Sequence, residues 1–144
     1  MTSRREAVLS TLLDRLEAGL SAPVRRNEAL PERVPAEGLV ILRDGDPGEP
    51  DVTLNPRSEF YRHRAELELL VTQPLAGGAE AMLDAIVAQV ATALAPDPSF
   101  GGLAENLVLG APDVGTLVIE AAAPILTARL VITVEYLASD PLAP

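Results

Sequence analysis

The chain of 144 residues contains no cysteine and no tryptophan, and its only histidine is His63. Without cysteine it can form neither a disulfide nor a thiolate metal site, a composition that suits a reducing compartment. Aromatic residues make up only 3% of the chain and hydrophobic residues 48%, so small aliphatic side chains must fill the interior by close packing. Because domains usually run to roughly 100–200 residues, we expect one domain over residues 1–144.

Long apolar runs are also missing. The longest apolar stretches are interrupted by Glu120, Arg129 or Glu135, far short of the roughly 18 to 20 residues that span a bilayer. Near the N-terminus, charged residues from Asp14 onward interrupt the apolar segment before a signal peptide can form. The sequence therefore predicts a soluble protein with no export signal and no membrane partner.

Charge is unevenly distributed along the chain, whose formal net charge is -10. Residues 1–64 hold ten basic residues, all arginine, against 11 acids, whereas residues 65–144 hold only Arg129 against ten acids. Such an acidic half repels phosphate backbones and anionic lipid, which argues against a nucleic-acid or membrane partner. The acidic surface either serves solubility or meets arginine-bearing patches on neighbouring subunits.

Residue patterns that carry catalysis are scarce. His63 falls among the apolar positions of a strand pattern. The chain has no cysteine and no G-x-S-x-G serine that His63 could activate as a nucleophile. The closely spaced acids from Asp44 to Asp51 would suit Ca²⁺, but the segment departs from the EF-hand loop at its glycine and at its final glutamate position. We therefore predict no enzyme activity, no catalytic residue, no metal site and no cofactor, although 21 acids leave room for an acid–base pair.

Local patterns predict an order of helices and strands. A capping box at Ser3 and Glu6 begins a helix over residues 4–18, which Gly19 ends. Strands are predicted at 39–42, 51–54, 60–71, 116–121 and 127–137, and a second helix at 79–94. The proline-containing stretch after the first helix is expected to be extended or irregular, with at most a short strand around 24–26. The turn chemistry of RDGDPGEP indicates that 51–54 returns beside 39–42 as a protruding hairpin, and residues 138–144 are expected to form a flexible tail.

The long strand separates two kinds of side chain. Tyr61, His63, Ala65, Leu67, Leu69 and Val71 fall on one face, and Arg62, Arg64, Glu66 and Glu68 fall on the other. We expect the first set to join the core and the four charged residues to contact a neighbouring subunit, because complementary charges set register between partners. The element order favours an α+β fold, a mostly antiparallel sheet with two helices packed against it.

Several segments together resemble one protein family. They are REAVLSTLLDRLEA (5–18), VRRNEALPERVPAEGLVILRDGDPGEP (24–50), YRHRAELELLV (61–71), the helix after Gly77 and Gly78, and VITVEYLASDPLA (131–143). In order and length these segments are similar to tail-terminator (tail-completion) proteins of long-tailed, non-contractile phages and of gene transfer agents. The likeness lies in fold and sequence texture, without an invariant motif.

The resemblance implies a structural protein of virion assembly. Such proteins form a ring, commonly of six subunits, that ends polymerisation of the tail tube and presents the surface for head attachment. The implied partners are further copies of the chain, the tail-tube protein and the head–tail connector, first in the host cytoplasm and then at the head-proximal end of the tail. By analogy, the candidate interface residues are Arg25, Arg26 and Arg33 of the connector and Asp44, Asp46, Glu49 and Asp51 of the hairpin.

Three other functions stay open. Relatives of the family serve as neck or head-closure components, which are the nearest alternative. A small enzyme or ligand-binding α/β domain would need a deep, polar-lined pocket near His63 or Asp44. A generic adaptor would work as a dimer, whereas a ring needs two unlike, complementary faces on each subunit.

Overall fold

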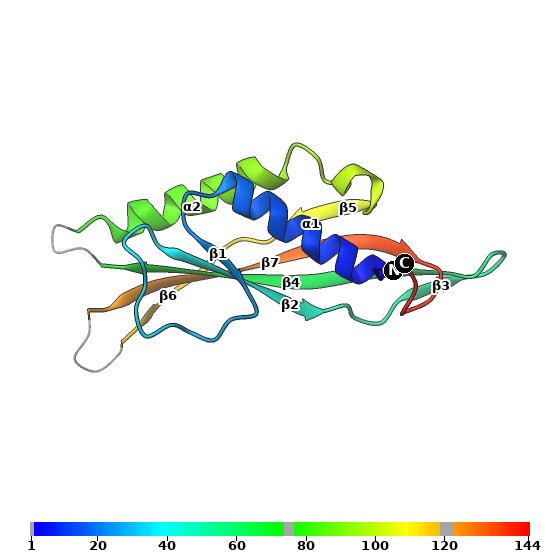
Figure 1. Ribbon diagram of the computed structural model, residues 1–144, viewed down its shortest axis with the longest axis horizontal. Helices are drawn as coiled ribbons and strands as arrows, with labels where there is room; N and C mark the ends of the chain where they lie inside the picture. Colours follow the sequence, from blue (N-terminus) through cyan, green and yellow to red (C-terminus); the bar gives the residue numbers. More distant parts are fainter. Residues whose placement is uncertain (1, 74–76, 119–122) are drawn as a thin grey trace.

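A computed structural model of the chain describes residues 2–73, 77–118 and 123–144 (Figure 1). In this part of the chain, two helices lie on one face of a mixed, mostly antiparallel sheet of seven strands. The predicted α+β class is confirmed. The helices leave the other face of the sheet uncovered, and we call it the open face.

Both helices match their predictions closely. α1 (Arg4–Gly19) begins with Ser3 as its cap, whose hydroxyl accepts the Glu6 amide N–H at 3.2 Å. α2 (Ala79–Leu94) has the predicted bounds. Gly19 is the last residue of α1, and a Cβ there would lie 2.6 Å from the Ala93 Cβ, so its missing side chain lets the two helices approach closely.

The sheet is built around its two longest strands. Its members are β1 (Val24–Arg26), β2 (Leu39–Asp46), β3 (Asp51–Thr53), β4 (Ser58–Thr72), β5 (Asn106–Leu109), β6 (Asp113–Leu117) and β7 (Ile125–Ala138). The strand order is β1-β2-β4-β7-β5, with β3 on β4 and β6 on β7. Central β4 and β7 pair antiparallel along nearly their whole lengths, and only β1 and β2 run parallel. The short strand that the sequence at most allowed around 24–26 is present as β1.

Two predictions for the hairpin are wrong. β2 continues to Asp46 through the segment expected to turn, with a register shift after Arg43. Gly45 permits this because it has a φ of +70°, and a Cβ there would overlap the Arg64 carbonyl group. β3 pairs with β4 and not with β2. The protruding hairpin is therefore β3–β4, turned by residues 54–57 (Figure 1).

Strands near the C-terminus differ from prediction in smaller ways. β5 was not predicted, because no element was assigned between the helix at 79–94 and the strand at 116–121. β6 spans Asp113–Leu117, earlier than the predicted 116–121, of which residues 119–121 lie outside the described part of the chain. β7 extends the predicted 127–137 at both ends.

Two apolar clusters lie on the two faces of the sheet. The main core, between the helices and the sheet, includes Leu9, Leu12, Leu16, Leu67, Leu69, Ile86 and Ile132. A small second core on the open face comprises Val34, Leu39, Ile41, Leu70 and Ile125. Residues 27–38 cross the open face and contribute Val34, so this connector covers one part of that face and leaves the rest exposed.

The two ends of the described chain lie together (Figure 1). The Arg4 amide N–H donates to the Ala143 carbonyl at 2.8 Å, which gives a partner to one of the free N–H groups at the start of α1. The flexibility of residues 138–144 stays a prediction. Neither helix in the described residues is long and apolar enough to cross a membrane.

Candidate interaction surface

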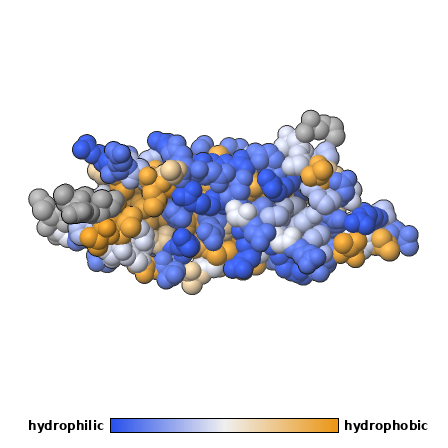
Figure 2. Space-filling view, turned by 90° about the horizontal axis from the view of Figure 1, so that it is seen from below, coloured by the Kyte–Doolittle hydropathy of each residue, from blue (hydrophilic) through white to orange (hydrophobic). Residues whose placement is uncertain are grey.

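Charged side chains of β4 form a stripe along the open face. Arg62 and Arg64 are exposed and Glu66 and Glu68 are half-buried, whereas the intervening His63 and the next alternate residues are buried. The predicted orientation of these four residues, away from the main core, is confirmed. Viewed from the open side, the middle of the molecule is hydrophilic, with apolar residues gathered toward its two ends (Figure 2).

Cross-strand ion pairs join this stripe to neighbouring strands. Arg129 of β7 lies 3.6 Å from Glu68 and 3.9 Å from Glu66, and Arg43 of β2 lies 3.3 Å from the other Glu68 oxygen. Arg62 reaches back to Asp51 of β3 at 2.8 Å. The side chains of Arg62 and Arg129 remain 58% and 60% exposed, so their guanidinium groups are accessible to a partner while paired within the chain.

Arg26 and Asp44, both expected at an interface, belong to an internal ion network. The Arg26 guanidinium donates to the Glu6 carboxylate at 2.7 and 2.8 Å and to the Asp44 carboxylate at 2.8 and 3.1 Å. These hydrogen bonds lower the pKa of Glu6 and of Asp44 and raise that of Arg26. The network fastens the first turn of α1 to β1 and β2, so Asp44 is not a free loop acid.

The other expected interface residues lie at the surface. Asp46 and Glu49 are exposed, and an Asp46 oxygen accepts the Gly48 N–H at 2.9 Å. Arg25 lies 3.7 Å from Glu28, with both side chains more than half exposed, and Arg33 is exposed on the connector. The structure therefore divides the expected set among several places. Four residues form the sheet stripe, Asp51 pairs with it, and Arg26 and Asp44 form the internal network. Asp46 and Glu49 lie at the end of β2 and in the link to β3, and Arg25 and Arg33 lie on β1 and the connector.

Buried polar groups form a column under α1. The Tyr61 hydroxyl donates to Glu59 at 2.7 Å, and the rings of Tyr61 and Tyr136 stack with centroids 5.4 Å apart. His63 bonds the Tyr136 hydroxyl through Nδ1, at 3.0 Å, and the Asp44 carbonyl through Nε2. Each of these side chains is at most 7% exposed. The groups satisfy one another inside the core, as buried polar groups must.

The environment of this column shifts its titrations. Burial raises the pKa of Tyr136 to about 12, and burial with the Glu59 hydrogen bond raises the pKa of Tyr61 to about 12. Burial lowers the pKa of His63, and hydrogen bonds from Tyr61 and Arg57 lower the pKa of Glu59. At neutral pH the column thus holds a neutral imidazole, two phenols and one carboxylate.

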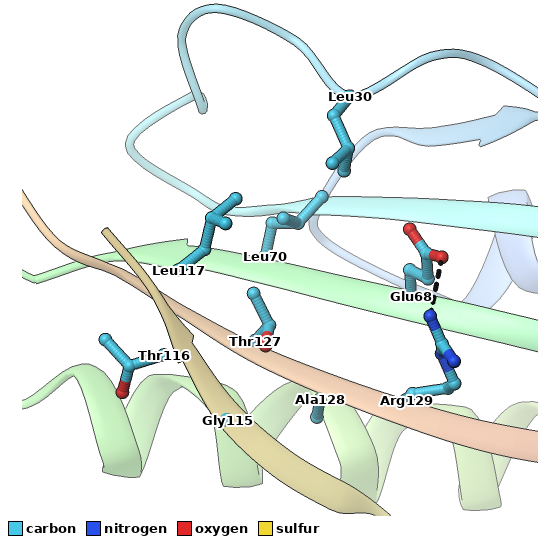
Figure 3. Close-up of a pocket in the computed structure, with 9 residues that line it drawn as sticks. All are labelled: Leu30, Glu68, Leu70, Gly115, Thr116, Leu117, Thr127, Ala128 and Arg129. Carbon is cyan, nitrogen blue, oxygen red and sulfur yellow. Dashed lines mark ion pairs between the residues drawn. The ribbon is translucent and has the colours of Figure 1, made fainter. Parts of the chain in front are cut away.

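An apolar groove lies on the open face between the connector and β6 (Figure 3). Its two adjoining lobes have volumes of about 270 and 380 Å³ and share Leu30, Leu70 and Leu117. Glu68 and Arg129 lie at the edge of one lobe, and Glu32 at the edge of the other. This groove lies away from His63 and Asp44, the positions where a polar catalytic pocket was sought.

A second apolar feature is convex. In the β3–β4 hairpin, Val52 of β3 is 48% exposed and Leu54 of the turn is 72% exposed. All residues from 52 to 57 are exposed, and we call them the hairpin tip. The tip lies at the opposite end of the sheet from β6 (Figure 1). The chain thus carries a projecting apolar tip at one end and an apolar hollow toward the other.

Sequence reasoning missed the groove, the apolar tip and two members of the buried column. Glu59 could have been found, since it has the same strand parity as Tyr61 and His63. Tyr136 has a weaker signal, because the charged Glu135 before it on β7 places Tyr136 on the opposite face of the strand. The groove has no local signal, because residues far apart in the sequence form it.

Comparisons of this chain with protein-family models and with curated proteins find no match.

Proposed function

We propose that this chain is a tail-terminator type of structural protein, whose copies join head to tail into a ring at the end of a tail tube. The ring stops addition of tube subunits and offers a surface to the head–tail connector. The family that the sequence resembles commonly uses six subunits. The proposal places the protein in the host cytoplasm during assembly and at the head-proximal end of the finished tail of a phage or gene transfer agent.

One structural observation carries the greatest weight in support. The helices cover a single face of the sheet, and the open face presents a charged stripe between an apolar tip and an apolar groove. Unlike, complementary surfaces on one chain support heterologous association, which closes into a ring when the rotation between copies permits. A two-fold dimer would instead use a single self-complementary patch.

The decisive experiment removes the protein from the assembling particle. We expect tail tubes of uncontrolled length that do not join heads, since nothing then ends tube polymerisation. Negative-stain imaging measures tail length and the fraction of tails with heads, and expression of the wild-type chain in trans should restore both. Tails of normal length on complete particles would reject the proposal.

The same experiment tests the nearest alternative role. A neck or head-closure component acts after the tube has stopped growing, so its removal would give tails of normal length that lack heads. The apolar groove favours a second alternative, a small ligand-binding domain, because such sites are concave and mostly apolar. That function predicts assembly of complete particles without the chain, the outcome that contradicts both structural roles.

A further inference from the structure

We propose that the hairpin tip of one copy docks into the apolar groove of the next copy. This inference rests on the head-to-tail ring proposed above and names the contact that would build it. The occupant of the groove is thus a second copy of this chain, contributing Leu54 and Val52.

The apolar side chains of the hairpin tip are left exposed within their own chain. β3 has only three residues, and all of them are exposed. Leu54 is 72% exposed in the turn that follows, and Asn55 beside it takes a positive φ of 68°. Apolar side chains gathered on a projecting element are typical of a contact with another molecule.

The groove offers a matching receptor. Leu30, Leu70 and Leu117 point toward the same hollow, from the connector, β4 and β6 (Figure 3). Each lobe, of about 270 or 380 Å³, exceeds the roughly 30 Å³ that one water molecule occupies in the liquid several-fold. Replacing that water with an aliphatic side chain removes apolar area from solvent, which favours association.

Charges beside the two features are complementary. Arg57 is the only charged residue of the hairpin tip, and its side chain stays 57% exposed although one guanidinium nitrogen bonds Glu59 at 2.7 Å. The acidic Glu32 lies at the edge of the groove and is exposed. An arginine beside the inserted leucine would therefore meet a carboxylate at the rim, which orients the docking and excludes a like-charged partner.

The tip cannot reach the groove of its own chain. Ser58 begins β4 next to the tip and Leu70 lines the groove, and the 12 steps along the strand from one to the other span about 40 Å at a rise of roughly 3.3 Å per residue. β4 is the centre of the sheet and cannot fold back. An intermolecular contact between tip and groove joins unlike surfaces, and it propagates around a ring when each copy gives its tip to one neighbour and receives the tip of another. A two-fold dimer with reciprocal tip–groove contacts would instead stop at two copies.

Because the chain contains no cysteine, disulfide trapping tests this contact directly. We would purify the full-length variants Leu54→Cys and Leu30→Cys and oxidise each alone and as an equimolar mixture. The mixture should give several-fold more disulfide dimer than either variant alone. A variant carrying both cysteines should give a ladder of covalent oligomers that ends at the ring size.

Leu142→Cys is the matched control, since Leu142 is an exposed leucine, at 86%, outside the tip. Its mixture with Leu30→Cys should give only background dimer. A second readout uses Leu54→Asp, which should abolish rings in light scattering while circular dichroism remains unchanged. A dimer yield from the Leu54→Cys and Leu30→Cys mixture no higher than the control overturns the inference.

The remaining outcomes test the tip–groove contact and the tail-terminator role independently of each other. Wild-type rings without tip–groove disulfides would overturn the contact and leave the tail-terminator role intact. Tip–groove disulfides in a chain whose removal leaves tails normal would support the contact and reject that role. If purified tail-tube protein shields Leu30→Cys from alkylation and Leu54→Cys gives no trapped dimer, the groove receives another protein and the inference is wrong.

Discussion

His63 lies between a hydroxyl and a carbonyl, and these two partners determine which ring nitrogen carries the proton. The Asp44 carbonyl can only accept, so Nε2 donates to it, and Nδ1 accepts from the Tyr136 hydroxyl. A second proton on Nδ1 would turn that acceptor into a donor and place a positive charge among buried groups. The site therefore favours the neutral imidazole, which is why the pKa of His63 is lowered.

This environment predicts a stability that depends on pH. Because the folded pKa lies below the unfolded value of about 6.5, the unfolded chain binds more protons just below that pH. Stability is therefore full above pH 6.5 and falls as the pH drops toward the folded pKa, by at most about 1.4 kcal/mol per pH unit. Urea unfolding between pH 7.5 and 5.5 should show this loss, and His63→Gln should reduce it.

The same prediction has a direct spectroscopic check. His63 is the only histidine in the chain, so an NMR titration of its imidazole reports one pKa without ambiguity. A value at or above 6.5 would contradict the buried neutral ring. Further loss of stability below about pH 4.5 is expected from Glu6 and Asp44, whose lowered pKa values make their charged forms part of the fold.

At the scale of elements, β4 contributes both to the main core and to the charged stripe. Its alternate residues build the main core on one side and the charged stripe on the other, along one strand of 15 residues. Its first residues pair with β3 in the hairpin that carries the tip, and its last residues line the groove. A substitution at a position of β4 that faces the open side can therefore alter association without disturbing the main core.

We predict that Arg62→Glu with Arg64→Glu leaves the monomer folded and prevents ring closure. Both side chains are exposed on the open face, so the core is untouched, while reversal of two charges sets like charges against the acidic C-terminal half of a neighbour. Circular dichroism reports the fold, and negative-stain imaging of tails reports the ring. Arg5→Glu, which reverses an exposed arginine of α1 outside the candidate interface residues, is the control for a single charge reversal.

Two results would contradict this prediction. Intact rings in the double variant would make the stripe an ordinary solvated face whose ion pairs contribute little. Loss of the folded signal would mean that the pairs of the stripe, such as Arg62 with Asp51, support the hairpin itself.

At the scale of the whole molecule, the two ends of the described chain lie next to each other. The start of α1 and the segment after β7 meet through the bond from the Arg4 N–H to the Ala143 carbonyl, beside the hairpin end of the sheet (Figure 1). The charged stripe, the tip and the groove are all built on one continuous sheet. Their relative placement depends on that sheet as a single body.

The closeness of the two ends predicts that a circular permutant will fold. Joining the two termini by a short Gly-Ser linker and opening the chain between Gly101 and Gly102, which are exposed and lie outside the sheet in a short 3-10 turn (Phe100–Gly102), should keep the sheet intact. Urea unfolding followed by circular dichroism and by tyrosine fluorescence should give one coincident transition, as expected for a single domain. Two separate transitions would show two independent folding units.

Local patterns in the sequence determined the helices and the two faces of β4. The bounds of α2 were predicted because its apolar residues recur at helical spacing and glycines and a proline flank it. The charged stripe of β4 was predicted because successive side chains of a strand point to opposite faces. Among the interface candidates, Arg62, Arg64, Glu66 and Glu68 thus lie where the sequence indicated, on the open face.

Tertiary structure alone decided which segments meet. Whether β3 pairs with β2 or with β4 depends on the bulge at Gly45 and on the length of β2, and neither is visible in a hydrophobic pattern. The capture of Asp44 by Arg26, 18 residues away, and the assembly of the groove from the connector, β4, β6 and β7 likewise depend on which segments the fold brings together. Local propensity records the period of one segment, whereas long-range contacts depend on the free energy of the whole sheet and its two cores.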